Sequence, residues 1–453
     1  MRIAVVQTPG TRLDEWAGTL TLIDELLVRA ADLKAEVIVL PECVWPAYYL
    51  GSRQAYFAAR QGGMPGPDEF LRRVGQQARA NGFAVCAAYV EEHETHLYNT
   101  ACWIDATGQP KAVHRKCFMW DFDHAYFEPG ERIEPFDAKV RTGIMICADA
   151  RLPEIPATLV ARGARVLFQP TGWVNGGTSE RLWNAQPDFL IAARAREFGV
   201  PIASASKWGR EGPTTFVGSS MICDADGNVL VQAGQHETTV MVADVEPGTP
   251  RSAEMSATTR AALLAENHWR LPAGEVPPLH LVLLPKGASQ QQVSEYQSSL
   301  PEPTLFLSAA TLPVKLEEAL PDTMQRCLDG PTTQPLTLNG VSITAASDID
   351  SRGFARIRAQ ALQGIHLAVI FGNQIANDLV RARACENRIF VAWVRDTGVT
   401  IVDPRGLIQT EQCWPRDLAD LPSMWINVST AADKEVAPGT NMITGRCPAQ
   451  YEF

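Results

Sequence analysis

Short apolar runs alternate with amphipathic stretches through the first half of the chain. The run Ile3–Gln7 is followed by apolar residues at helical spacing from Leu13 to Ala31, and then by EVIVL, which ends at Leu40. Further strands are expected at 83–90, 98–105, 111–116, 143–147 and 164–170, helices at 65–82, 155–162 and 186–198, and a hairpin at 219–233. Strands that alternate with helices in this way favour an α/β sandwich whose sheets are buried between helices.

The pattern changes after residue 250. The segment 251–278 is polar and rich in Pro and Gly near its ends, which is typical of a linker or connecting arm. At 453 residues the chain is too long for one ordinary core, so two domains are expected. We therefore place a first domain at 1–250 and a second at 279–453, joined by the arm.

The second half of the chain repeats the first half in weaker form. Four stretches are matched in the same order: 36–42 with 280–286, 143–154 with 340–351, 190–198 with 379–387, and 221–230 with 400–409. Chance similarity rarely preserves such an order, so a second, abbreviated copy of the same sandwich is expected. In this alignment Glu42 corresponds to Lys286 and Cys147 corresponds to Thr344.

Composition narrows the class of protein. The formal net charge of −11 disfavours a nucleic acid or an anionic membrane as partner. The chain begins directly with a strand pattern, and no apolar run is long enough to span a bilayer. The ten cysteines include no CxxC pair, which indicates reduced thiols in the cytoplasm rather than disulfides or a metal site. His93 and His96 are expected to be a solvated pair, so no metal is predicted.

Three short motifs carry the chemistry. LPEC contains Glu42, HRKCF contains Lys116, and ICADARLPE contains Cys147. These motifs, in this order, resemble those of the nitrilase or carbon–nitrogen hydrolase superfamily, whose members carry a glutamate, a lysine and a cysteine. The resemblance covers residues 1–250 strongly and 280–453 as a degraded repeat. It implies a four-layer αββα sandwich, complete in the first half and abbreviated, without the three residues, in the second.

The residue types fit that chemistry. A free thiol has a pKa of about 8.5, so Cys147 needs a base, such as Glu42, to become a nucleophile. Attack on an amide carbonyl builds negative charge on oxygen, which the Lys116 ammonium and the amide of Ala148 would stabilise. The three groups together supply attack, charge stabilisation and proton transfer, so no cofactor is implied.

Several further residues are candidates for the same site. Superfamily members commonly place a second glutamate where WDFDHAYFEPG has Asp123, which is one methylene shorter. The role of that glutamate is then kept with altered reach, taken by Asp121 or Glu128, or lost. Tyr48, Trp120 and Trp173 are near the three motifs and are expected to line an apolar pocket. Charged residues after the cysteine are expected to form a network that holds its turn, and these are Asp149, Arg151 and Glu154 with Arg194, Arg196 and Glu197.

The sequence therefore predicts a hydrolase of a small carboxamide or N-carbamoyl compound that works through a thioester on Cys147. The alternatives are nitrile hydrolysis by the same residues and a non-catalytic protein that binds a metabolite. Because superfamily members pair sandwich to sandwich, the resemblance also implies an intramolecular pseudo-dimer of the two halves. Further association into a homo-oligomer is compatible with this arrangement.

Overall fold

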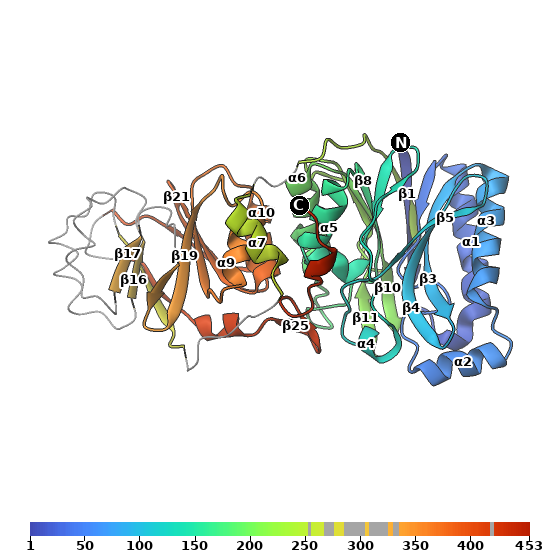
Figure 1. Cartoon of the computed structure of the whole chain (residues 1–453), viewed down its shortest axis with the longest axis horizontal. Helices are drawn as coiled ribbons and strands as arrows, with labels where there is room; N and C mark the ends of the chain where they lie inside the picture. Colours follow the sequence, from blue (N-terminus) through green and yellow to red (C-terminus); the bar gives the residue numbers. More distant parts are fainter. Residues whose placement is uncertain (252–254, 267–275, 285–303, 308–324, 329–334, 417–420) are drawn as a thin grey trace. The chain divides into compact units, whose positions relative to one another are not determined.

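The computed structural model describes residues 1–251, 255–266, 276–284, 304–307, 325–328, 335–416 and 421–453. Contacts divide the chain into two units (Figure 1). Unit 1 contains 1–253, 436–440 and 445–453, and unit 2 contains 254–435 and 441–444. The predicted match at Lys286 lies outside the described residues.

Unit 1 contains two sheets that lie face to face. The larger has the order β11-β10-β1-β2-β3-β4-β5, with β14 also paired to β1, and the smaller has the order β13-β12-β9-β8-β7-β6. The rings of Trp103 and Phe168 stack between the sheets, with centroids 5.6 Å apart. The strands of the larger sheet are β1 (Arg2–Pro9), β2 (Val37–Val39), β3 (Ala84–His93), β4 (His96–Ile104), β5 (Pro110–Arg115), β10 (Lys207–Glu211), β11 (Thr214–Val217) and β14 (Thr239–Asp244). Those of the smaller are β6 (Phe136–Asp137), β7 (Arg141–Ile144), β8 (Val166–Pro170), β9 (Ile202–Ala205), β12 (Met221–Cys223) and β13 (Val229–Gln232).

Helices cover the outer face of each sheet, which gives the four layers α, β, β and α (Figure 1). On the larger sheet lie α1 (Trp16–Asp32) and α3 (Pro67–Asn81), and on the smaller lie α5 (Glu154–Ala161) and α6 (Ile191–Phe198). Helix α3 has Pro67 in its first turn and ends at Gly82, whose φ of 75° is the left-handed conformation that glycine adopts readily. The predicted helix boundaries therefore agree with the structure to within a few residues.

The described residues of unit 2 also form two larger sheets. Their orders are β17-β16-β15-β24 and β18-β19-β20-β21-β22-β23. The first has β15 (Leu279–Leu283), β16 (Thr304–Leu307), β17 (Gln325–Leu328) and β24 (Ser423–Ile426). The second has β18 (Leu336–Leu338), β19 (Val341–Ser347), β20 (Leu367–Phe371), β21 (Phe390–Arg395), β22 (Gly398–Val402) and β23 (Ile408–Cys413). Among the residues that the structure describes in unit 2, the α-helices are α7 (Ala257–Leu264), α9 (Ala355–Ala361) and α10 (Asn377–Asn387).

Strand pairing corrects the predicted equivalence of Cys147 and Thr344. Arg165, just before β8, donates its amide to the carbonyl of Arg141, and His366, just before β20, donates its amide to that of Ser342. Six residues beyond these acceptors lie Cys147 and Asp348. Thr344 instead lies within β19, opposite Ala368. The prediction was wrong by four residues because apolar strands resemble one another at more than one alignment.

The match of 280–286 to 36–42 is also wrong in position. Strand β15 pairs antiparallel with β24 and parallel with β16. In unit 1 it is β1, rather than β2, that pairs antiparallel with β14 and parallel with β2. The pairing therefore places β15 in the position of β1.

The end of the chain belongs to unit 1, whereas the predicted second domain extends to residue 453. Arg446 Nε bonds Glu154 Oε1 at 2.8 Å, and both side chains are buried. Arg162 pairs with Glu452 at 2.8 Å, and the amide of Glu452 donates to Thr158 Oγ1. Residues 436–440 and 445–453, here called the C-terminal tail, thus dock on α5 through polar contacts that no sequence pattern announces.

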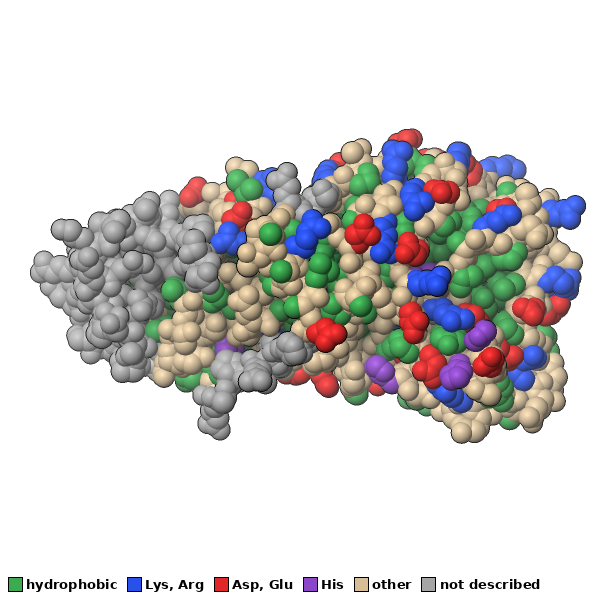
Figure 2. Space-filling model, viewed as in Figure 1, with side chains coloured by type: hydrophobic (Ala, Val, Ile, Leu, Met, Phe, Trp, Pro, Cys, Tyr) green, Lys and Arg blue, Asp and Glu red, His purple; other side chains and the backbone are tan. Residues whose placement is uncertain are grey.

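Charged side chains of both signs are interspersed over the visible face of unit 1 (Figure 2). A charged group that is fully removed from water is therefore an exception that needs a partner. Among the described residues, no helix combines the length and the apolar character needed to cross a membrane. The described residues also contain no cluster of His, Cys, Asp or Glu suited to a metal ion.

The buried pair of Arg446 and Glu154 predicts a measurable stability cost. Arg446→Met leaves the Glu154 carboxylate without this guanidinium, and breaking a buried pair in this way typically costs about 3–5 kcal/mol. Equilibrium urea denaturation of the full chain measures the change. The exposed pair of Lys139 and Glu36 is the control, because Lys139→Met should cost less than about 1 kcal/mol. Equal losses for the two variants would contradict the docking of the C-terminal tail.

Candidate active site

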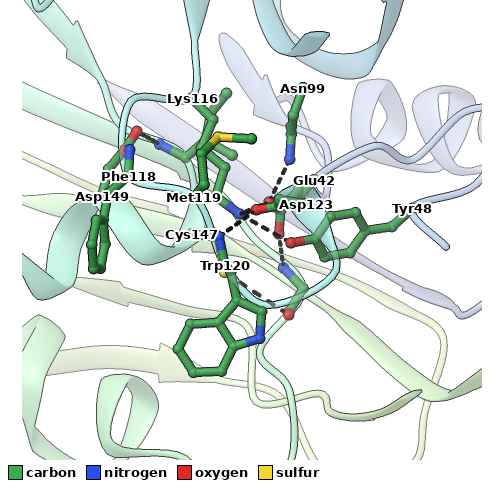
Figure 3. Close-up of polar contacts among 12 residues, drawn as sticks. Glu42, Tyr48, Asn99, Lys116, Phe118, Met119, Trp120, Asp123, Cys147 and Asp149 are labelled. Carbon is green, nitrogen blue, oxygen red and sulfur yellow. Dashed lines mark hydrogen bonds and ion pairs between the residues drawn. The ribbon is translucent and has the colours of Figure 1, made fainter. Parts of the chain in front are cut away.

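Strand ends of the two facing sheets bring Glu42, Lys116 and Cys147 together (Figure 3). Glu42 follows β2, Lys116 follows β5, and Cys147 follows β7 after two further residues. All three are buried, and the Glu42 and Lys116 side chains are fully removed from solvent. Glu42 and Lys116, which are 74 residues apart in the sequence, thus meet in one place with Cys147.

Lys116 is the centre of the polar cluster. Its Nζ lies 2.7 Å from Glu42 Oε1, 2.6 Å from Asp123 Oδ2 and 3.0 Å from the Tyr48 hydroxyl oxygen. An ammonium has three N–H groups, so each of these acceptors takes one. Burial alone would lower the pKa of Lys116, but the charges of Asp123 and Glu42 outweigh that effect and raise the pKa well above its usual value. The lysine is therefore a fixed cation.

Glu42 is held by two further groups besides Lys116. Asn99 Nδ2 donates to Oε1 at 2.8 Å, and the amide of Gly172 donates to Oε2 at 2.9 Å. Burial raises the pKa of Glu42, the charge of Asp123 raises it further, and Lys116 opposes both. A carboxylate with a raised pKa in a dry site has the properties of a general base.

Asp123 occupies the place where a second glutamate was anticipated. It begins the short helix α4 (Asp123–Tyr126), and its Oδ2 also accepts the amide of Trp120 at 2.8 Å. The shorter side chain therefore reaches Lys116 because the turn before α4 brings its backbone close. Within the described part of the chain, Asp123 Oδ1 is buried without a hydrogen-bond partner.

Cys147 lies on a strained turn. Its φ of 44° is in the left-handed region, which costs a non-glycine residue of order 1–3 kcal/mol. Asp149 stabilises the turn, because Oδ2 accepts the amide of Ile146 at 2.8 Å and Oδ1 accepts the amide of Phe118 at 2.8 Å. His114 Nε2 lies 3.0 Å from Asp149 Oδ2. The same carboxylate thus ties the turn of Cys147 to the segment that carries Lys116.

The charged network that was predicted to hold the turn of Cys147 is present in part. Arg194 pairs with Glu197 at 2.9 Å and donates to the carbonyls of Ala150 and Arg151 at 3.0 and 3.1 Å. Glu154 is engaged by Arg446, a residue far outside the expected set.

The thiol of Cys147 is protonated in the resting protein. Burial raises its pKa to about 12, with a contribution from the charge of Glu42 that Lys116 partly offsets. The sulfur lies 3.9 Å from the carbonyl oxygen of Gly172. A thiol in this state cannot act as a nucleophile until a base accepts its proton.

Ala148, Trp120 and Trp173 were also predicted to belong to the site, and each has different neighbours in the structure. Ala148 follows the cysteine in the same buried turn. The ring of Trp120 lies under the guanidinium of Arg151, at 4.9 Å. The backbone of Trp173 follows Gly172, and its amide donates to Ser206 Oγ at 3.3 Å. In the described structure, the indole N–H groups of Trp120 and Trp173 are buried without a partner.

Sequence reasoning missed several residues of the site. Asn99 and Gly172 hold Glu42, and neither stands in a motif that signals it. Thr440, from the C-terminal tail, accepts the amide of Asp121 at 2.7 Å and contacts the carbonyl of Met119 at 3.4 Å. These contacts arise from tertiary structure, and no local pattern could have revealed them.

Comparison with known proteins identifies the family to which the first half of the chain is similar. The model of the carbon-nitrogen hydrolase family matches residues 2–254. N-carbamoylputrescine amidase of Arabidopsis thaliana is 28% identical over 243 residues, covering 49% of this chain and 79% of that protein. Omega-amidase NIT2 of Danio rerio is 28% identical over 258 residues, covering 54% and 88%. A nitrilase of Pyrococcus abyssi is 30% identical over 226 residues, covering 49% and 81%.

Among solved structures, an amidase from Nesterenkonia sp. AN1, with acrylamide added at its active-site cysteine, is similar to this chain. The two are 28% identical, the match covers 54% of this chain and 93% of that one, and the TM-score is 0.46. The family match extends over more than half of the present chain and includes every strand and helix of unit 1 described above. The chain therefore belongs to the carbon–nitrogen hydrolase family and is an amidase-type enzyme of that family.

Proposed function

We propose that the enzyme hydrolyses the carbon–nitrogen bond of a small carboxamide or N-carbamoyl compound through a thioester on Cys147. The main support for this proposal is the fully buried cluster of Glu42, Lys116 and Asp123 beside the buried, protonated thiol of Cys147. One lysine cation is shared between two carboxylates, so one carboxylate keeps a raised pKa and can accept a proton.

In the first half of the reaction, Glu42 accepts the thiol proton and the sulfur of Cys147 attacks the carbonyl carbon. The negative charge that forms on the carbonyl oxygen is stabilised by Lys116 Nζ and by the amide of Ala148. Glu42 then donates its proton to the nitrogen as the carbon–nitrogen bond breaks, and ammonia or an amine departs. The acyl group remains on sulfur.

In the second half, Glu42 accepts a proton from water, and the resulting oxygen nucleophile attacks the thioester carbon. The carbon–sulfur bond breaks, the acid leaves, and the proton returns to the sulfur. Tyr48, Trp120 and Trp173 would contact the substrate, with the indole N–H groups as unused donors. Asp123 would orient Lys116 throughout.

The names of the relatives suggest the substrate classes to test. They include amidases of N-carbamoylputrescine and omega-amides and a nitrilase. Nitrile hydrolysis by the same three residues is the second candidate, because a nitrilase is among the relatives that match this chain.

We further infer that unit 2 is a degenerate copy of the catalytic sandwich. The sheet β18-β19-β20-β21-β22-β23 has the same order and the same parallel and antiparallel pairings as β6-β7-β8-β9-β12-β13. In both, the register shifts near the end of the last hairpin, and Asp224 and Asp403 accept amides two and four residues on. Asp348 then stands where the nucleophile would be, so this copy has no thiol at that position.

The substrate class is tested by ammonia release from a panel of carboxamides, N-carbamoyl amino acids, carbamoyl amines and nitriles. We expect release from one amide or carbamoyl class, and loss of that release by at least about 10⁴-fold in Cys147→Ala. Cys102→Ala, which removes a buried thiol elsewhere in unit 1, is the control and should retain activity. Release unaffected by Cys147→Ala would contradict the proposal, and release from nitriles alone would move it to the second candidate.

The raised pKa of Glu42 predicts where activity is lost in acid. Glu42 must be ionised to accept a proton, so kcat/KM should fall as the pH drops through its raised pKa, above the usual value of about 4.3. The charge of Asp123 contributes to that rise, so Asp123→Asn should move the acidic limb to lower pH. A pH profile of both proteins measures the shift. A limb that stays in place or moves upward would contradict the assignment of Glu42.

We also propose that the degenerate copy serves as the intramolecular partner of the catalytic sandwich, as a pseudo-dimer. The support is that unit 2 retains sheet and helix positions while its counterpart of Cys147 is Asp348. A crystal structure of the full chain is the test, with the expectation that unit 2 packs against unit 1. Two units that do not touch each other in the crystal and do not cross-link in solution would contradict the pairing.

A further inference from the structure

The Tyr48 hydroxyl is the neutral member of the cluster around Lys116. Its oxygen accepts the third N–H of the lysine at 3.0 Å, while the other two go to carboxylates. Its own proton has no hydrogen-bond acceptor among the described residues. The Tyr48 hydroxyl is fully buried and lies next to Lys116, the proposed oxyanion stabiliser. Its proton is therefore available for a hydrogen bond to a group that enters the site.

The ring of Tyr48 is held in one place by packing. Phe122 lies against it with centroids 4.9 Å apart, and Phe216 lies at 6.2 Å. A side-chain carbon at Gly172 would come within 3.3 Å of the ring, so the tyrosine packs against the same glycine whose amide binds Glu42. The hydroxyl therefore cannot leave the cluster without disturbing that packing.

The main chain of Tyr48 is held by a second buried ion pair. Glu211 Oε1 accepts the amides of Tyr48 and Tyr49, the latter at 2.8 Å, and its Oε2 pairs with Lys207 Nζ at 2.9 Å. Lys207 also donates to the carbonyl of Cys43 at 3.0 Å. Both ends of the loop between Glu42 and Tyr49 are thus fixed by two residues of strand β10.

A contribution to stability does not by itself explain why Lys207 and Glu211 form a buried ion pair here. Removing two charges from water is costly, and apolar residues of similar volume often replace a buried ion pair without loss of stability. Apolar side chains could not, however, accept two backbone amides and donate to a carbonyl. The groups that the pair engages all belong to the loop that carries Glu42 and Tyr48, which points to a role in positioning.

We propose that the Tyr48 hydroxyl donates a hydrogen bond to the oxyanion formed on the substrate carbonyl, and that Lys207 and Glu211 position it. The proposal rests on the thioester mechanism described above. As charge develops on the carbonyl oxygen, this stronger acceptor takes the third N–H of Lys116 from the phenol oxygen. The phenol then donates its own proton to the same oxyanion. Burial, with the charges of Asp123 and Glu42, raises the pKa of Tyr48 well above its usual value, so the hydroxyl keeps its proton.

The test is a double-mutant cycle on amide hydrolysis by the full chain, with Tyr48→Phe, Glu211→Gln and the double variant. Tyr48→Phe should lower kcat by about 10²-fold, as loss of one oxyanion donor does, with little change in KM. Glu211→Gln should lower kcat by about tenfold in the wild type but by less than about twofold in the Tyr48→Phe background. Equal effects in the two backgrounds would overturn the positioning role, and a kcat of Tyr48→Phe close to that of the wild type would overturn the donor role.

Two control variants separate these effects from general destabilisation. Tyr56→Phe removes a hydroxyl from another buried tyrosine of unit 1, and Glu386→Gln breaks the buried pair of Arg383 and Glu386 in unit 2. Both should leave kcat within about twofold of the wild type. A loss of kcat in these controls equal to that of Tyr48→Phe would overturn the assignment to Tyr48.

Binding of a small aldehyde provides a second measurement that does not need turnover. Glu42 accepts the thiol proton, the sulfur of Cys147 bonds to the aldehyde carbon as the carbon–oxygen π bond opens, and the negatively charged oxygen then occupies the oxyanion position. Tyr48→Phe should weaken this inhibitor by about the same factor as it lowers kcat/KM, and an unchanged inhibition constant would overturn the donor role. If the wild type hydrolyses no amide, or Cys147→Ala hydrolyses it equally well, the thioester mechanism itself fails, which is a different result.

Discussion

The structure of the site depends on one buried lysine cation that is shared by two buried carboxylates. Glu42 and Asp123 lie 2.7 and 2.6 Å from Lys116 Nζ, and all three side chains are fully buried. Charges so far from solvent are tolerated only when each one has partners, so the surrounding backbone is arranged to provide them. The amides of Gly172 and Trp120 serve this purpose, as does the side chain of Asn99. Burial raises the pKa of Glu42, and the charge of Asp123 raises it further against the opposing effect of Lys116.

The need to hold this cluster explains features at some distance from it. Strand ends deliver Glu42 and Lys116, but Cys147 requires a turn in the left-handed region, which Asp149 stabilises by bonding both to the turn and to the segment after Lys116. The loop after Glu42 likewise contains a left-handed residue, Cys43, with a φ of 38°, and its carbonyl is bound by Lys207. Strain at two points of the site is thus offset by ionic groups that reach the backbone, a common arrangement where geometry has to be kept.

The sequence was informative where local chemistry determines structure. Proline and glycine mark the ends of α3, short apolar runs mark the strands, and the structure brings Glu42, Lys116 and Cys147 together. It failed where the answer depends on pairing between distant segments. Thr344 was matched to Cys147 although the hydrogen bonds favour Asp348, because one apolar strand fits another at several registers. Asn99, Glu211 and Thr440 carry no local signal, since their importance comes only from what the fold places beside them.

The C-terminal tail has a consequence for the order in which the protein is made. Domains of a growing chain generally fold as they emerge, the N-terminal part first. Almost all of unit 1 precedes residue 254, but Thr440, which bonds the backbone of Asp121 beside the cluster, and Arg446, which is buried against Glu154, are translated after the whole of residues 254–435. On the ribosome, the first sandwich therefore exists for some time before Arg446 contacts Glu154 and before Thr440 accepts the amide of Asp121. The catalytic unit is therefore complete only after residues 436–453 are made, so a chain that terminates before them leaves the loop around Asp123 without the hydrogen bond from Asp121 to Thr440.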